Sequence, residues 1–190
     1  MKSHELLSGL NAVVAEMIAR TEARFLSLPD HILNKKVNRE AWSILECYEH
    51  LNRYLRYYNP AIAKRLAGVD REVNVDVKST WIGRKSLAAM HPSNQKKQKT
   101  LKHMNPVNSS LDLSVITEFL SHQNDLMLLI AKARSADVNK IKIPIEFFRL
   151  ATFTLAEALQ FVVVHQQRHF IQLETVVKAA DQSRTASLVV

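Results

Sequence analysis

Apolar residues recur every three or four positions over four long stretches of the chain, which is the spacing of one face of an α-helix. The stretches cover about residues 3–26, 43–68, 112–134 and 154–180. In the first of them the repeated apolar positions are Leu6, Leu10, Val13, Val14, Met17 and Ile18. The pattern therefore predicts four long amphipathic helices.

Helix-terminating residues stand at the edges of these stretches. Ser43 is followed three positions later by Glu46, and Thr154 is followed in the same way by Glu157. This is the capping-box pattern of a helix N-terminus, in which each residue satisfies a backbone amide of the other. Gly68 is well placed to end the second helix in a left-handed conformation.

The second and third helices are joined by a long polar connection, residues 69–110, which contains Pro92 and Pro106. Because plain connections are rarely so long, we expect a short helix within it, around residues 86–90. A long crossover allows the second and third helices to run parallel as neighbours. The sequence thus predicts an all-α four-helix bundle forming one domain over residues 1–180, with a frayed tail at 181–190.

Composition excludes several classes of protein. Three glycines, far apart, cannot form a dinucleotide-binding or phosphate-binding loop, and the single cysteine excludes an internal disulfide and any multi-thiolate zinc site. The longest apolar run, residues 126–131, is far shorter than the ~20 residues that span a bilayer. The N-terminal stretch lacks the features of an export signal, so we expect a cytoplasmic protein with no membrane association.

The net charge of +8 is unevenly distributed. Residues 68–110 contain eight basic and three acidic side chains, an excess of +5, and their most basic part is Lys96, Lys97, Lys99 and Lys102. Nucleic-acid binding through residues 96–102 is one interpretation. No aromatic residue is interleaved with these lysines to stack on bases, which favours a solvated connection instead.

Eight histidines are present, and two of them stand out. His165 and His169 are four residues apart, so their imidazoles share one face of the fourth helix and can bind the same ion. That face also carries Leu155, Ala158, Val162, Leu173 and Val176. Burial of imidazoles in an apolar core is costly unless they are hydrogen-bonded or bind a metal. Core histidines bonded to Gln166, Gln172 or a backbone carbonyl are the alternative, and His50 is the best candidate for a third ligand.

Two short motifs resemble a known family. Trp42-Ser43, Glu46 and Glu49-His50-Leu51, followed by HQQRHFIQ at residues 165–172, look like the DinB/YfiT-like superfamily. The resemblance covers the whole chain in order and spacing. It implies an up-down-down-up four-helix bundle with His50, His165 and His169 as a metal-binding triad. The basic segment 96–102 and residues 141–153 match no pattern of the family.

Three imidazole ligands leave at least one coordination position open, as in catalytic rather than structural zinc sites. Zinc suits such a site best, and nickel is also compatible. A di-iron site is excluded, because it requires Glu-x-x-His spacing, whereas Glu46/His50 and Glu118/His122 are four apart. Glu46 is a candidate to orient His50, although its capping role competes.

Other polar and aromatic residues near the motifs have two interpretations each. Arg168 is expected to form a solvated or interhelical salt bridge rather than to bind substrate. Tyr54, Tyr57 and Trp81 would either line the mouth of a pocket or belong to the core.

The favoured function is a metal-dependent enzyme that acts on a small-molecule substrate. It is either a hydrolase or a thiol-dependent S-transferase, and in the second case a low-molecular-weight thiol is a further substrate. Both activities use the same open metal position, and the sequence favours neither. A non-catalytic metal-binding or stress-response protein is the alternative from another class, and a nucleic-acid binder is a weaker one. A homodimer is compatible with this assignment.

Overall fold

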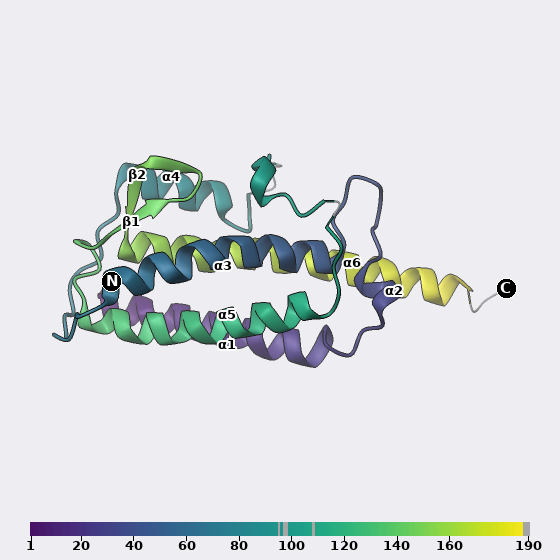
Figure 1. The fold of residues 1–190 in the computed structure, drawn as a ribbon, viewed down its shortest axis with the longest axis horizontal. Coiled ribbons are helices and arrows are strands. Elements are labelled where there is room, and N and C mark those ends of the chain that lie inside the picture. Colours follow the sequence, from purple (N-terminus) through teal and green to yellow (C-terminus); the bar gives the residue numbers. More distant parts are fainter. Residues whose placement is uncertain (95, 97–98, 108, 188–190) are drawn as a thin grey trace.

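Four long helices form the body of the protein in the computed structural model, which describes residues 1–94, 96, 99–107 and 109–187. They are α1 (Ser3–Arg24), α3 (Ile44–Leu66), α5 (Ser114–Lys132) and α6 (Leu155–Ser187). Figure 1 shows that α1 and α6 run in one direction and that α3 and α5 run in the opposite direction. The predicted up-down-down-up four-helix bundle is confirmed.

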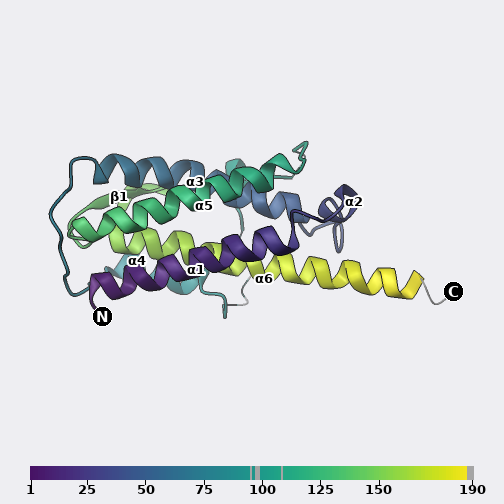
Figure 2. The same cartoon turned by 90° about the horizontal axis from the view of Figure 1, so that it is seen from below.

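The packing order of the bundle follows from the long crossover. Residues 67–113 carry the chain from the end of α3 back to the end at which α3 began, so α5 packs as a parallel neighbour of α3. Helix α1 lies against α5, and α6 lies against both α3 and α1 (Figure 2). Each helix therefore has an antiparallel and a parallel neighbour in the bundle.

One continuous apolar core joins the four helices. Its largest fully buried side chains are aromatic, and they come from α3, α5 and α6 as well as from the segments beside the bundle: Tyr48, Tyr58, Phe25, Phe119, Phe153 and Phe161. Removal of this apolar surface from water is the main stabilising contribution to the fold. The single domain over residues 1–180 stays a prediction.

The predicted helix termini are present in detail. Ser43 Oγ accepts a hydrogen bond from Glu46 N, and Ser43 N donates to Glu46 Oε2. Thr154 and Glu157 form the same pair of bonds at the start of α6. Gly68 follows α3 with a φ of 74°, the left-handed conformation that glycine adopts without strain.

The crossover holds two further elements. Helix α4 (Trp81–Met90) contains the predicted segment 86–90 but begins earlier, because Thr80 Oγ1 accepts from Gly83 N and caps its first turn. The 3₁₀-helix η1 (Lys102–Met104) follows. Lys96, Lys99 and Lys102 are exposed, as expected of a solvated connection, whereas Lys97 lies outside the described residues. Two other short elements are α2 (Asp30–Leu33) and η2 (Ala133–Ser135).

A β-hairpin that the sequence pattern does not predict precedes α6. Strand β1 (Lys142–Ile145) pairs antiparallel with β2 (Phe148–Thr154), and Ile143 lies opposite Phe153. Both of these side chains are buried, so the hairpin closes one end of the core. The fold is therefore all-α with a small two-stranded addition over residues that matched no family pattern.

Helix α6 extends to Ser187, beyond the predicted end near residue 180. No glycine or proline interrupts residues 155–187, so the backbone has no local reason to leave the helix. Fraying of residues 181–190 stays a prediction, and residues 188–190 lie outside the described residues. Within the described part of the chain, none of the helices has the length and apolar character needed to cross a bilayer.

Candidate metal centre

The structure brings together His50 on α3 with His165 and His169 on α6, although 115 residues separate His50 from His165. His165 Nε2 lies 3.2 Å from His50 Nε2 and 3.1 Å from His169 Nε2. One ligand atom from each residue lies within 4.8 Å of the other two. Because α3 and α6 are antiparallel neighbours, the bundle itself sets this convergence.

Hydrogen bonds at Nδ1 fix the tautomer and the orientation of two of the imidazoles. His50 Nδ1 donates to the carbonyl oxygen of Met104 at 2.8 Å, and His169 Nδ1 donates to Gln172 Oε1 at 2.6 Å. Since these oxygens only accept, the proton of each neutral ring is on Nδ1 and the lone pair is on Nε2. Both lone pairs therefore face His165.

Burial keeps all three rings neutral. Desolvation lowers the pKa of His50 to about 4, and it lowers the pKa of His165 and of His169 well below the usual value for histidine. The mutual proximity of the three rings lowers the pKa of His165 and His169 further. A neutral imidazole is the form that binds a metal, so the protonation state suits a ligand role.

A metal ion bound between the three rings would explain why their Nε2 atoms lie so close together. His165 can donate one Nε2 proton, to either His50 or His169, which leaves the other close nitrogen pair without a hydrogen. Tetrahedral zinc, with Zn–N of about 2.0–2.1 Å, would separate two ligand nitrogens by about 3.4 Å. The observed separations of 3.2 and 3.1 Å are close to this, so the residues fit such an ion.

Aromatic rings surround the three histidines and restrict their orientation. The Trp42 ring lies 4.6 Å from the His50 ring and stacks on the His169 ring at 5.8 Å. The Tyr54 ring lies 4.4 Å from the His165 ring, and Phe161 is nearly parallel to His165 at 5.9 Å. These rings exclude water and so lower the local dielectric constant, which strengthens electrostatic interactions among the three histidines.

The carboxylate predicted as a candidate partner of His50 has other partners. Glu46 Oε2 caps α3 through Ser43 N, and Glu46 Oε1 bonds to Lys36 Nζ at 2.8 Å. The partner of His50 is instead the backbone carbonyl of Met104 on η1. No sequence signal identifies that contact, because every residue type carries a carbonyl.

Other predicted residues have mixed outcomes. Arg168 forms hydrogen bonds to the carbonyl oxygens of His91, Asn94 and Lys96, which corrects the expectation of a salt bridge. Tyr54 lies beside the histidines, and its ring contacts that of His165.

Tyr57 and Trp81 lie elsewhere. Tyr57 donates a hydrogen bond to the carbonyl of Pro144 in β1, and Trp81 is 67% exposed at the start of α4. Neither residue has a ring contact with the three histidines among those described.

Comparison with known proteins agrees with this geometry. The sequence model of the DinB superfamily matches residues 14–173, a segment that includes all three histidines and most of the bundle.

The chain belongs to the DinB superfamily.

A solved structure similar to this chain is that of YfiT from Bacillus subtilis, described as a probable metal-dependent hydrolase with an unusual four-helix bundle topology. The TM-score is 0.58 at 13% sequence identity, and the match covers 92% of this chain and 87% of that one. At this identity the likeness shows a shared four-helix-bundle fold and not a shared activity. No curated protein is significantly similar in sequence.

Proposed function

We propose that this DinB-superfamily chain is a metal-dependent enzyme that holds a divalent ion, preferably zinc or else nickel, with His50, His165 and His169. The observation that carries the proposal is the convergence of three buried Nε2 atoms whose spacing fits a single ion. Hydrogen bonds from Nδ1 of His50 and His169 would orient these ligands and raise their basicity.

The proposed chemistry is activation of a nucleophile. When bound by three imidazoles, such an ion keeps an open position at which it lowers the pKa of water or of a thiol. The chain contributes neutral ligands, and the rings of Trp42, Tyr54 and Phe161 exclude bulk water. Hydrolysis of a small-molecule substrate and thiol-dependent S-transfer are both compatible with this arrangement. The description of YfiT as a probable metal-dependent hydrolase supports the first of them.

A non-catalytic metal-binding or stress-response role is the second candidate. The observation that favours it is the low exposure of the three histidines, which are 2–6% exposed. A site so enclosed suits an ion that is held rather than used. Catalysis would require a substrate to pass between the aromatic rings, so a direct assay separates the two roles.

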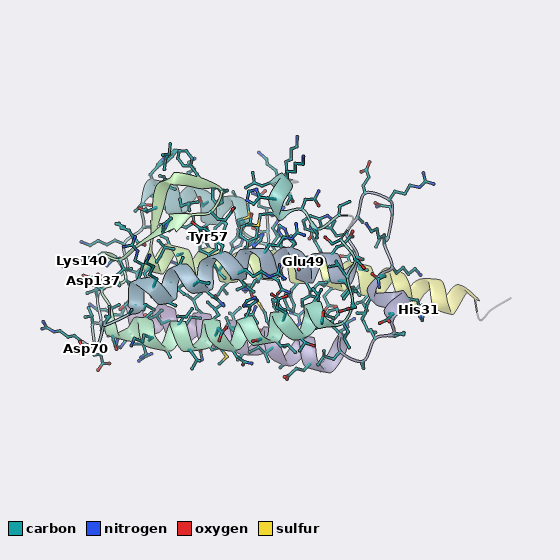
Figure 3. The ribbon with its side chains drawn as sticks, viewed as in Figure 1. His31, Glu49, Tyr57, Asp70, Asp137 and Lys140 are labelled. Carbon is teal, nitrogen blue, oxygen red and sulfur yellow. The ribbon has the colours of Figure 1, made fainter. Side chains whose placement is uncertain are left out.

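Metal analysis followed by an activity screen tests the proposal. Protein purified without a polyhistidine tag or nickel resin is analysed for metals as wild type, as His165→Ala and as His31→Ala. His31 is exposed on α2 and serves as the matched control (Figure 3). We expect one zinc or nickel ion per chain in wild type and control, and loss of the ion in His165→Ala.

The metal-loaded protein is then screened with ester and amide substrates and with a small thiol plus an electrophile. Turnover by the loaded protein that His165→Ala lacks supports an enzyme and identifies its class. A bound metal without turnover favours the second candidate, and wild-type protein that never binds metal contradicts both.

A further inference from the structure

Met104 presents its backbone carbonyl to His50 from η1, at the end of the crossover connection. A carbonyl in a surface connection can orient an imidazole only if that connection is held in place. The residue that holds it is Arg53, which lies on α3 one turn after His50.

Arg53 bonds to the residues on both sides of Met104. Its Nη1 donates to the carbonyl of His103 at 3.1 Å and to the carbonyl of Asn105 at 2.7 Å, and its Nη2 donates to Ser109 Oγ at 3.2 Å. The flanking carbonyls therefore point toward Arg53, while the carbonyl between them points toward His50. A planar guanidinium holds several acceptors in a fixed arrangement, which an alkyl ammonium cannot do.

Two neighbours reduce the freedom of this arrangement further. Glu49 is buried, and its Oε1 accepts from Arg53 Nε at 2.7 Å, which fixes the guanidinium on α3. Asn105 precedes Pro106, and a residue before proline favours the extended backbone that Asn105 adopts. Glu49 is labelled in Figure 3, in the N-terminal part of α3.

We propose that Arg53 is a positioning residue of the metal centre, which fixes the Met104 carbonyl on His50 Nδ1 and so directs the Nε2 lone pair of His50 at the ion. The role of His50 as a ligand rests on the proposed function. The effect of Arg53 on the hydrogen bond and tautomer of His50 does not require a metal.

Arg56 provides a matched control on the same helix. It also bonds to Glu49, through Nη1 and Nη2 at 3.0 Å each, but its other partner is Glu118 on α5. Arg56→Met thus removes a cation from Glu49 without removing a described contact to residues 103–109. If Arg53 acted only by neutralising the charge of Glu49, Arg53→Met and Arg56→Met would have the same effect.

The test combines two measurements on wild type, Arg53→Met and Arg56→Met, with circular dichroism to verify folding. Long-range ¹H–¹⁵N spectra of the demetallated proteins report the tautomer of His50. Isothermal titration with zinc reports affinity. In Arg53→Met we expect His50 to change from the Nδ1–H form to a tautomer mixture and zinc affinity to fall about 10–100-fold, the usual effect of losing a partner behind a metal ligand. Arg56→Met is expected to match wild type in both measurements.

Retention of the Nδ1–H signal and of wild-type zinc affinity in Arg53→Met would overturn the proposal, as would equal effects of both variants. If Arg53→Met fails to fold, Arg53→Lys keeps a cation beside Glu49 but not the fork of donors, and the same changes are expected in it. If wild type binds neither zinc nor nickel, the proposed function fails, while the tautomer measurement still decides the role of Arg53.

Discussion

At the scale of single residues, burial makes each of the three histidines a neutral base. An imidazole in the bundle core loses the water that would stabilise its charged form, so its pKa falls. The pKa of His50 is lowered to about 4, and those of His165 and His169 also lie well below the usual value. In the unfolded chain the same residues titrate near the ordinary pKa of about 6.5.

This difference predicts that the demetallated protein loses stability in mild acid. Because the folded pKa values are lower than the unfolded ones, the unfolded chain binds more protons below about pH 6.5. The stability is complete above that pH and is lost as the pH falls toward the folded values. Between pH 7.5 and 5.5 we expect a loss on the order of 1 kcal/mol for each histidine, measured by denaturant unfolding with a chelator present.

Single substitutions assign the effect to these residues. His165→Leu should reduce the loss by about one third, since one of three neutral bases is removed. His31→Ala should show the same loss as wild type, because His31 is exposed. A free energy of unfolding that does not change between pH 7.5 and 5.5 would be evidence against neutral, buried imidazoles.

At the scale of elements, one carboxylate joins two helix N-termini. Glu157 is fully buried, and it accepts hydrogen bonds from Thr154 N at the start of α6 and from Thr80 N at the start of α4. Helix α4 can approach this closely because its third residue is Gly83. A Cβ atom at that position would overlap the carboxylate of Glu157.

Gly83→Ala is therefore expected to destabilise the protein by about 2–3 kcal/mol, through overpacking and displacement of the capping carboxylate. Gly9→Ala is the matched control. Gly9 is exposed in α1, and no atom lies within 4 Å of the position that an alanine methyl group would take, so this substitution should stabilise the helix by about 0.5–1 kcal/mol. Thermal or denaturant unfolding of both variants measures the difference, and a Gly83→Ala protein as stable as wild type would contradict the close approach.

The elements also differ in how far the sequence predicts them. The long helices have a strong 3.6-residue period and local capping pairs such as Ser43 with Glu46, so their positions follow from sequence. The hairpin escapes prediction because β1 contains Pro144, which cannot donate a ladder hydrogen bond, and because its turn at Glu146 lacks glycine or asparagine. The alternation of buried Ile143 and Ile145 was the available signal.

For the candidate site, predictability depends on the kind of contact. His165 and His169 follow from their spacing on one helix. The residues alone make His50 only the best candidate for a third ligand, and the family resemblance implies the triad, because pairing of α3 with α6 is a tertiary property. The Met104 carbonyl and its restraint by Arg53 could not be predicted. Every residue carries a backbone carbonyl, so the sequence does not indicate which one contacts His50. The direction of that carbonyl depends on how the connection folds.

At the scale of the whole molecule, the up-down-down-up topology determines what the site can be. The crossover allows α3 to lie between parallel α5 and antiparallel α6, and its return places η1 over His50 (Figures 1 and 2). Two of the three candidate ligands share the rigid helix α6, while the third depends on how α3 packs. Helix α6 alone therefore fixes the relative positions of His165 and His169, and packing of the bundle adds His50.

The most direct test of the three-histidine centre is isothermal titration of demetallated wild type, His50→Ala, His165→Ala and His169→Ala with zinc. We predict one ion per wild-type chain and weaker binding in His50→Ala, which keeps the preformed pair on α6. Binding should be weakest in His165→Ala and His169→Ala, because the remaining pair spans two helices. All four proteins should stay folded by circular dichroism, since the apolar core does not depend on the histidines. Zinc binding by His50→Ala as tight as that of wild type would contradict the account.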